Sequence, residues 1–154
     1  MTNLKTGDKA PDFSFTNQEG QSKKLSDFRG HKVILYFYPK DNTPGCTQEA
    51  CSLRDGYDEL TGKGYEVIGV SPDSQKSHDG FRSKHNLPFH LVSDSDKSIA
   101  TSYGVWGKKK MMGREYMGII RTTFVINEKG LIEQVIEKVD TKNHAVQVVN
   151  LMEN

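Results

Sequence analysis

The chain has 154 residues, with 21 lysines and arginines against 20 aspartates and glutamates, so its formal net charge is +1. The length fits one domain of common size, residues 1–154, and the balanced charge gives no electrostatic reason to expect nucleic acid or an anionic membrane as a partner. The longest apolar or aromatic run, 33–38, is far shorter than the roughly 20 residues that span a bilayer, and residues 1–8 carry no signal-peptide pattern, so we expect a soluble cytoplasmic protein.

The first half of the chain predicts a hairpin, a buried strand and a helix. Aromatic residues alternate with polar ones around a Glu-Gly turn over 12–25, which favours a β-hairpin, and a single glycine-closed turn follows over 25–30. Residues 33–38 are apolar on both faces and rich in β-formers, as is typical of a central strand buried on both sides. We expect a helix over 47–61, because two glycines follow it closely.

The second half continues the alternation of strands and helices. We expect a strand over 65–71, a helix that begins after Asp73 or Ser74 and runs to about Asn86, a strand over 89–93 and a short helix over 97–103. Segment 104–118 contains several glycines and the basic run Lys108–Lys110, so we interpret it as a solvated loop. A hairpin of two strands, 122–126 and 131–138, then precedes an amphipathic helix over 143–152.

This order of elements predicts an α/β fold. Strands that alternate with helices imply a mixed central β-sheet flanked by helices, with the N-terminal β-hairpin added to it. No linker, repeat or low-complexity segment interrupts the pattern, so we expect a single domain.

The chain has two cysteines, Cys46 and Cys51. In a reducing compartment such a pair is more often catalytic, redox-sensing or metal-binding than structural. Cys46 follows two prolines and a glycine at the opening of the expected helix, where free backbone N–H groups and the helix dipole favour a thiolate over a thiol. The alternative is that Cys46 packs as a small apolar residue.

The spacing of the two cysteines argues against a resting disulfide. In a continuous helix, residues five apart have Cα atoms about 8.6 Å from each other. A disulfide needs Cα atoms within about 7 Å. The pair could therefore bridge only after the first helical turns unwind, which would suit a transient catalytic disulfide. Simple inward packing of Cys51 remains the alternative.

Segment 39–51 resembles the active site of peroxiredoxins. Their pattern Pro-x-x-x-Thr-x-x-Cys falls on Pro39, Thr43 and Cys46, and the second cysteine five positions later is similar to one subgroup, the bacterioferritin comigratory protein or peroxiredoxin Q type. Three further segments are similar to segments of that family: 10–13, 69–73 and 121–124.

The resemblance implies a thioredoxin-like fold and thiol-dependent reduction of hydroperoxides. Cys46 would be the peroxidatic cysteine and Cys51 the resolving one. Thr43 would hydrogen-bond the thiolate and the incoming peroxide, and Pro39 would shield the pocket from water. Cys46 would be oxidised to a sulfenic acid and condense with Cys51 to a disulfide, which thioredoxin or a similar dithiol would reduce.

Two charged residues complete the implied site. Arg121 matches the active-site arginine of the family, and Glu49 matches a position that orients it. An arginine has five donors in a fixed plane and stays charged, so it can stabilise a thiolate and polarise a peroxide together. Without the resemblance, Arg121 would be interpreted as a surface residue. The resemblance implies no metal and no organic cofactor, and we expect a monomer.

Other functions remain open alternatives. A disulfide reductase would normally show a Cys-x-x-Cys pair. A zinc site is disfavoured because no histidine pair has ligand spacing, although His78 and His85 could share a helix face, where we expect solvated positions. A redox sensor or chaperone-like role needs a client that the sequence does not show. Val105, Trp106 and the pair Met111-Met112 either line the substrate pocket or pack as plain loop residues.

Overall fold

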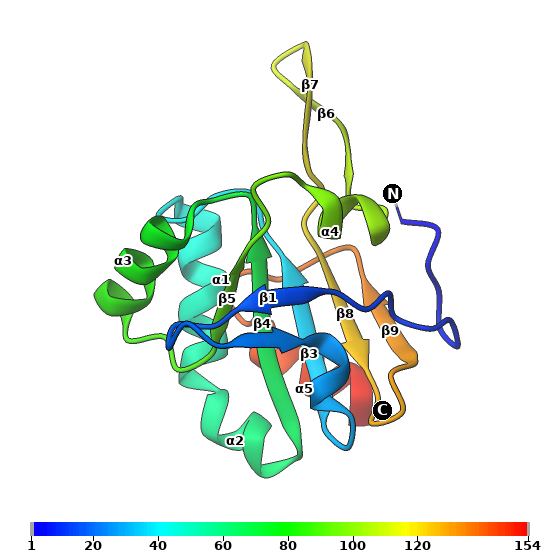
Figure 1. The fold of residues 1–154 in the computed structure, drawn as a ribbon. Coiled ribbons are helices and arrows are strands. Elements are labelled where there is room, and N and C mark those ends of the chain that lie inside the picture. The colour runs from blue at the N-terminus through cyan, green and yellow to red at the C-terminus, as the bar shows by residue number, and fades with distance from the viewer. Residues whose placement is uncertain (1, 154) are drawn as a thin grey trace.

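The computed structural model describes residues 2–153 and is built around a five-stranded sheet (Figure 1). In spatial order the strands are β5 (His90–Ser93), β4 (Tyr65–Ser71), β3 (Lys32–Phe37), β8 (Thr122–Ile126) and β9 (Ile132–Ile136). Strands β3, β4 and β5 are parallel, β8 is antiparallel to β3, and β9 is antiparallel to β8. The mixed central sheet predicted from the sequence is confirmed.

Helices and a hairpin cover the two faces of this sheet. One face packs against α1 (Pro44–Asp55), α2 (Tyr57–Gly62), α3 (Gln75–His85) and α5 (His144–Glu153). The other packs against the 3₁₀ turn η1 (Leu25–Phe28), α4 (Ser98–Ser102) and the N-terminal hairpin of β1 (Ser14–Thr16) and β2 (Ser22–Lys24). Figure 1 shows the hairpin in front of the sheet and α5 behind it. The predicted N-terminal hairpin is therefore confirmed.

Strand β3 is buried on both faces, as its composition predicts. Because successive side chains of a strand point to opposite faces, Val33, Leu35 and Phe37 join the core beneath the hairpin, whereas Ile34 and Tyr36 join the core beneath the helices. None of these five side chains is more than 2% exposed. The loop after β3, which leads into α1, thus starts from a strand that is buried on both faces.

The predicted single helix over 47–61 is wrong in its start and in its continuity. Helix α1 begins at Pro44, because the fixed φ of proline suits the first helical position. Gly56 then separates α1 from α2. A Cβ built on Gly56 would lie 2.6 Å from the Cβ of Ala145, so glycine is what allows α5 to approach the chain at this point.

The predicted loop over 104–118 is also wrong. It contains β6 (Trp106–Met111) and β7 (Arg114–Ile119), which pair antiparallel and project from the body of the protein (Figure 1). Met112 and Gly113 join them with φ of 53° and 82°, the two positive values of a tight hairpin turn. Most side chains of both strands are exposed, so the sequence lacks the apolar alternation that reveals a half-buried hairpin.

The other elements lie close to their predicted bounds. Ser74 caps α3 by accepting a hydrogen bond from the Ser77 N–H at 3.1 Å, and Asn86 ends that helix in the left-handed conformation. The turn between β8 and β9 is closed by the Asn127 side chain, which accepts from two backbone N–H groups. Within residues 2–153, no helix combines the length and apolarity needed to cross a membrane.

Candidate active site

Cys46 lies in the first turn of α1 and is 1% exposed. Helix α1 starts two residues before Cys46: Thr43 is the N-cap residue, with an extended backbone, and Pro44 is the first helical residue. The Thr47 N–H donates to the Thr43 carbonyl at 2.9 Å and closes this turn. The sulfur therefore belongs to a helix end whose first backbone N–H groups lack helical partners, which favours negative charge there.

Arg121 links Cys46 to Glu49. Its Nη2 donates to Cys46 Sγ at 3.3 Å, and its Nη1 donates to Glu49 Oε1 at 2.6 Å. Cys46 and Glu49 are three residues apart on α1 and so share one helix face, and Arg121 reaches both from the chain just before β8. A Cβ built on Gly45 would lie 3.3 Å from Arg121 Nη2, so glycine leaves room for the guanidinium.

Burial and charge act against each other at this ion pair. Burial is the largest influence on Glu49 and raises its pKa to about 7, while the charge of Arg121 acts in the opposite direction. For Arg121, burial alone would lower the pKa, but the negative charges of Glu49 and Cys46 raise it. The guanidinium thus stays protonated, and Glu49 is the group of the pair that titrates near neutral pH.

A fully buried histidine lies behind Glu49. The Gln147 amide nitrogen donates to the Lys138 carbonyl, so the Gln147 amide oxygen faces His144. His144 Nδ1 therefore donates to Gln147 Oε1 at 2.8 Å. His144 Nε2 is then free to accept from the Thr123 hydroxyl at 2.8 Å. Burial lowers the pKa of His144 to about 4, so this ring is neutral at physiological pH.

The neutral ring leaves one carboxylate oxygen of Glu49 without a hydrogen bond. Glu49 Oε2 lies 3.5 Å from His144 Nε2, but that nitrogen carries no hydrogen to donate. Among the described residues Glu49 Oε2 has no hydrogen-bond partner. An ionised glutamate is therefore costly at this position, in agreement with its raised pKa.

We expect the Glu49→Gln variant to lose a pH dependence of stability that the wild type has. An unburied glutamate ionises near pH 4.5, whereas Glu49 in the folded protein keeps its proton until about pH 7. The folded form binds more protons between these values, so stability from this group is full below pH 4.5 and falls as pH rises through 7, by roughly 3 kcal/mol. Denaturant titrations at pH 4.5 and above pH 7 measure this: the free energy of unfolding of the variant should rise relative to wild type by that amount. A constant difference would contradict the argument.

Thr43 and Pro39 lie at the same end of β3 but make different contacts. The Thr43 hydroxyl donates to the Lys40 carbonyl at 2.8 Å, and its role toward a thiolate or peroxide stays a prediction. Pro39 is half-buried two residues after the end of β3, and its shielding role also stays a prediction. The geometry thus brings together Cys46, Glu49 and Arg121 from the predicted set.

Cys51 lies in the second half of α1, and both cysteines are free. Helix α1 continues without interruption between them, as the argument against a resting disulfide requires. Cys51 is half-buried, and its Sγ lies 3.8 Å from His85 Nδ1. Sequence reasoning missed this contact because the two residues are 34 positions apart.

The expected solvated position of His78 is wrong, because its side chain is fully buried. His78 Nδ1 lies 2.8 Å from Asp41 Oδ2, and Tyr38 donates its hydroxyl to Asp41 Oδ1 at 2.6 Å. Burial would raise the pKa of Asp41, but these hydrogen bonds lower it overall. With Asp73, which accepts from the Asp41 N–H, this is a cluster with the spacing of metal ligands. Its polar atoms already bond one another, and the cluster ties the loop before α1 to α3.

The structure shows how the residues of the predicted loop are packed. Val105 is fully buried in the core and Trp106 packs against it. Met111 and Met112 are 60% and 98% exposed near the hairpin tip.

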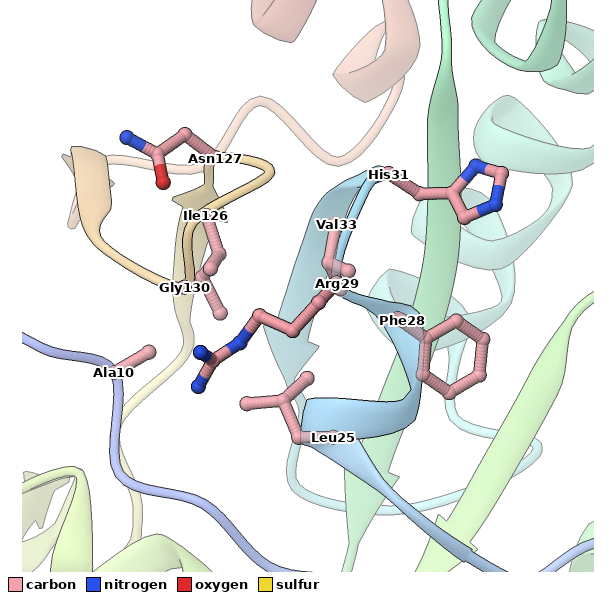
Figure 2. Close-up of a pocket in the computed structure, with 9 residues that line it drawn as sticks. All are labelled: Ala10, Leu25, Phe28, Arg29, His31, Val33, Ile126, Asn127 and Gly130. Atoms are coloured by element: carbon pink, nitrogen blue, oxygen red, sulfur yellow. The ribbon is translucent and has the colours of Figure 1, made fainter.

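Figure 2 shows a small cavity between η1 and the turn that joins β8 to β9. Its volume is about 10 Å³, room for roughly one water molecule. The Arg29 side chain reaches toward Gly130, whereas His31 points away from the cavity (Figure 2). A Cβ built on Gly130 would lie 2.5 Å from Arg29 Cζ, so glycine leaves room for this arginine. No cysteine lines this cavity, so it is separate from the thiol site.

The chain is similar over nearly its whole length to known proteins. Residues 6–135 match the AhpC/TSA family. The chain is 49% identical over 146 residues to a putative peroxiredoxin bcp of Coxiella burnetii, covering 95% of this chain and 97% of the relative. It is 44% identical to peroxiredoxin Bcp of Bacillus subtilis, covering 98% and 96%. Among solved structures, a cysteine-to-serine mutant of PrxQ from Xylella fastidiosa is 33% identical, with a TM-score of 0.91 and coverage of 99% and 98%. A structure of the bacterioferritin comigratory protein of Xanthomonas campestris, described in terms of alkyl peroxide reduction, is 35% identical, with a TM-score of 0.87 and coverage of 99% and 98%.

Proposed function

Because this chain belongs to the AhpC/TSA family, as a peroxiredoxin of the Bcp and PrxQ type, we propose that Cys46 is its peroxidatic cysteine and Cys51 its resolving cysteine. The chain has the thioredoxin-like fold of these proteins and is a thiol-dependent peroxidase. We assign the whole chain, 1–154, to a single domain of this kind.

The contact between Arg121 and Cys46 carries the assignment. A buried cysteine at a helix start, 3.3 Å from a guanidinium, is held where a thiolate is stabilised twice, by the helix and by the cation. The thiolate attacks one peroxide oxygen, the O–O bond breaks, and the negative charge passes to the leaving oxygen. Arg121 is a preorganised donor for that charge, and Glu49 holds its plane. Thr43 and Pro39 complete the proposed pocket.

The cycle then needs the second cysteine and an external dithiol. Cys46 sulfenic acid condenses with Cys51 once the first turns of α1 unwind, and the resulting disulfide is reduced by exchange with thioredoxin or a similar protein. We propose hydrogen peroxide and organic hydroperoxides as substrates and a cytoplasmic monomer as the working form. That compartment supplies reduced dithiols, and Cys46, Glu49 and Arg121 all come from one chain.

The test is hydroperoxide consumption coupled to thioredoxin, thioredoxin reductase and NADPH, for wild type and the Cys51→Ser variant. Wild type should turn over continuously. The variant should consume about one equivalent of peroxide per chain and then lose its thioredoxin-dependent turnover, because no intramolecular disulfide can form. Wild-type turnover in Cys51→Ser would refute the role of Cys51. A wild type that oxidises at Cys46 without turning over would indicate the sensor instead.

A further inference from the structure

His85 is placed to act on the second cysteine. Its Nδ1 lies 3.8 Å from Cys51 Sγ, within reach of a hydrogen bond donated by the thiol. Cys51 comes from α1 and His85 from the last residue of α3, so the contact joins two helices. Both side chains are only half-buried.

The His85 ring packs against one aromatic side chain, and its backbone is fixed at the end of α3. The ring packs edge-on against Phe81, with centroids 5.2 Å apart and planes at 76°. Arg54 Nη1 donates to the His85 backbone carbonyl at 2.8 Å. Asn86 turns the chain into the left-handed conformation immediately afterwards and ends α3. Packing on Phe81 thus orients the ring, while Arg54 and the helix end hold the backbone from which it projects toward Cys51.

The charged groups around this pair belong to the same two helices. On α1, Arg54 pairs with Asp55 at 3.0 Å besides holding the His85 carbonyl. On α3, Lys84 is exposed and Arg82 donates its Nε to the Phe89 carbonyl at 3.0 Å. Arg54 and Arg82 are thus engaged by backbone carbonyls and by Asp55, Lys84 is exposed to solvent, and the imidazole is the group that contacts the thiol.

Resolution of a sulfenic acid needs a thiolate, because the thiolate is the nucleophile in thiol–disulfide chemistry. Cys51 lies beyond the first turn of α1 and lacks the contacts that favour a thiolate at Cys46. Imidazole is the side chain best suited to take up a proton near neutral pH. A base placed within reach of the thiol is what this step requires.

We propose that His85 is the general base for the resolving thiol, an inference that rests on the proposed function. The Cys51 proton passes to His85 Nδ1, and the Cys51 thiolate attacks the sulfur of Cys46 sulfenic acid. The S–O bond breaks and its electron pair leaves with the oxygen as hydroxide. Protonation by the imidazolium turns hydroxide into water and regenerates neutral His85. One S–S bond forms, and no other reactant is consumed.

The anchoring of α1 fits this order of events. Oxidation of Cys46 removes the thiolate that attracts Arg121, which weakens the hold on the first turn. The second half of α1 stays tied by Arg54 to α3 and by Ser52 Oγ, which accepts from the Ala145 N–H of α5 at 3.3 Å. Unwinding therefore moves Cys46 toward a Cys51 that remains beside His85.

The experiment separates the two chemical steps in a single turnover. Reduced protein is mixed with one equivalent of hydrogen peroxide, quenched with an alkylating agent and analysed by mass spectrometry for thiol, trapped sulfenic acid and disulfide. In His85→Gln, sulfenic acid should form at the wild-type rate, and disulfide should form at least ~10-fold more slowly near neutral pH. The deficit should close at alkaline pH, where a thiol ionises without a base.

Matched measurements keep the test decisive. His31→Gln makes the same substitution at an exposed histidine outside the thiol site and should resolve like wild type. Free imidazole added to His85→Ala should restore resolution, an effect that a purely structural role would not give. Unchanged resolution in His85→Gln, a deficit of equal size at every pH, or no rescue by imidazole would overturn the proposal. Failure of wild type to form sulfenic acid at Cys46 would instead refute the proposed function.

Discussion

Replacing Cys46 by serine is expected to lower kcat/KM for hydrogen peroxide by at least ~10³-fold, to the limit of detection of a coupled assay. The reason is that the thiolate is the attacking group, and a hydroxyl stays protonated beside Arg121 under conditions in which a thiol ionises. Serine keeps the size of the side chain in a position that is 1% exposed, so the chemistry is removed with little change of packing. The measurement is peroxide-dependent NADPH oxidation with thioredoxin and its reductase.

Two controls give this result its meaning. Urea unfolding of Cys46→Ser should show a cooperative transition, which excludes a loss of activity by misfolding. A single addition of peroxide should leave Cys51 reduced in Cys46→Ser, because peroxide oxidises Cys46 first and Cys51 reacts only with the oxidised Cys46. Residual activity above one per cent of wild type would mean that Cys46 does not perform the first step.

The part of the predicted site that lies in segment 39–51 follows from short-range sequence patterns. Pro39, Thr43, Cys46 and Cys51 lie close together in the sequence around a helix start, and their types alone indicate thiol chemistry. Arg121 is different, because it lies 75 positions from Cys46 and reaches it only through the pairing of β3 with β8. No periodicity reveals such a contact, and only the family resemblance pointed to Arg121.

Three histidines on the helices show the same limit. His78, His85 and His144 look alike as scattered polar residues in the sequence. In the fold, two are fully buried and the third contacts Cys51, because helices α3 and α5 pack against the side of the sheet that carries α1. Burial of a helical polar residue depends on what covers that helix face, and the sequence of the helix does not contain this information.

The errors in the fold have local physical causes. The break at Gly56 follows from the close approach of Ala145 on another helix, which the sequence around Gly56 does not express. The hairpin of β6 and β7 is exposed on both faces, so its strands lack the alternation on which strand prediction depends. Elements that pack on the core, such as β3 and β4, were predicted within one residue because their apolar runs are the cause of their burial.

Arg121→Met is expected to lower the second-order rate of Cys46 oxidation by about 10²–10³-fold. Methionine removes the donor 3.3 Å from Cys46 Sγ, and with it the group that meets the charge on the leaving oxygen. It also leaves the fully buried Glu49 without its cation, so part of any loss of stability comes from an unpaired carboxylate. The double variant Arg121→Met with Glu49→Gln removes that penalty and should regain stability without regaining rate.

The shape of the guanidinium matters as well as its charge. Arg121→Lys keeps the charge, but an ammonium cannot hold Glu49 and Cys46 in one plane, so we expect it to recover only part of the rate. Arg114→Met, at an exposed arginine of the β6–β7 hairpin, is the matched control and should react like wild type. Stopped-flow oxidation of the reduced proteins gives the rates directly. If the rate of Cys46 oxidation fell less than tenfold in Arg121→Met, this role of Arg121 would be contradicted. The helix start alone would then be enough to activate Cys46.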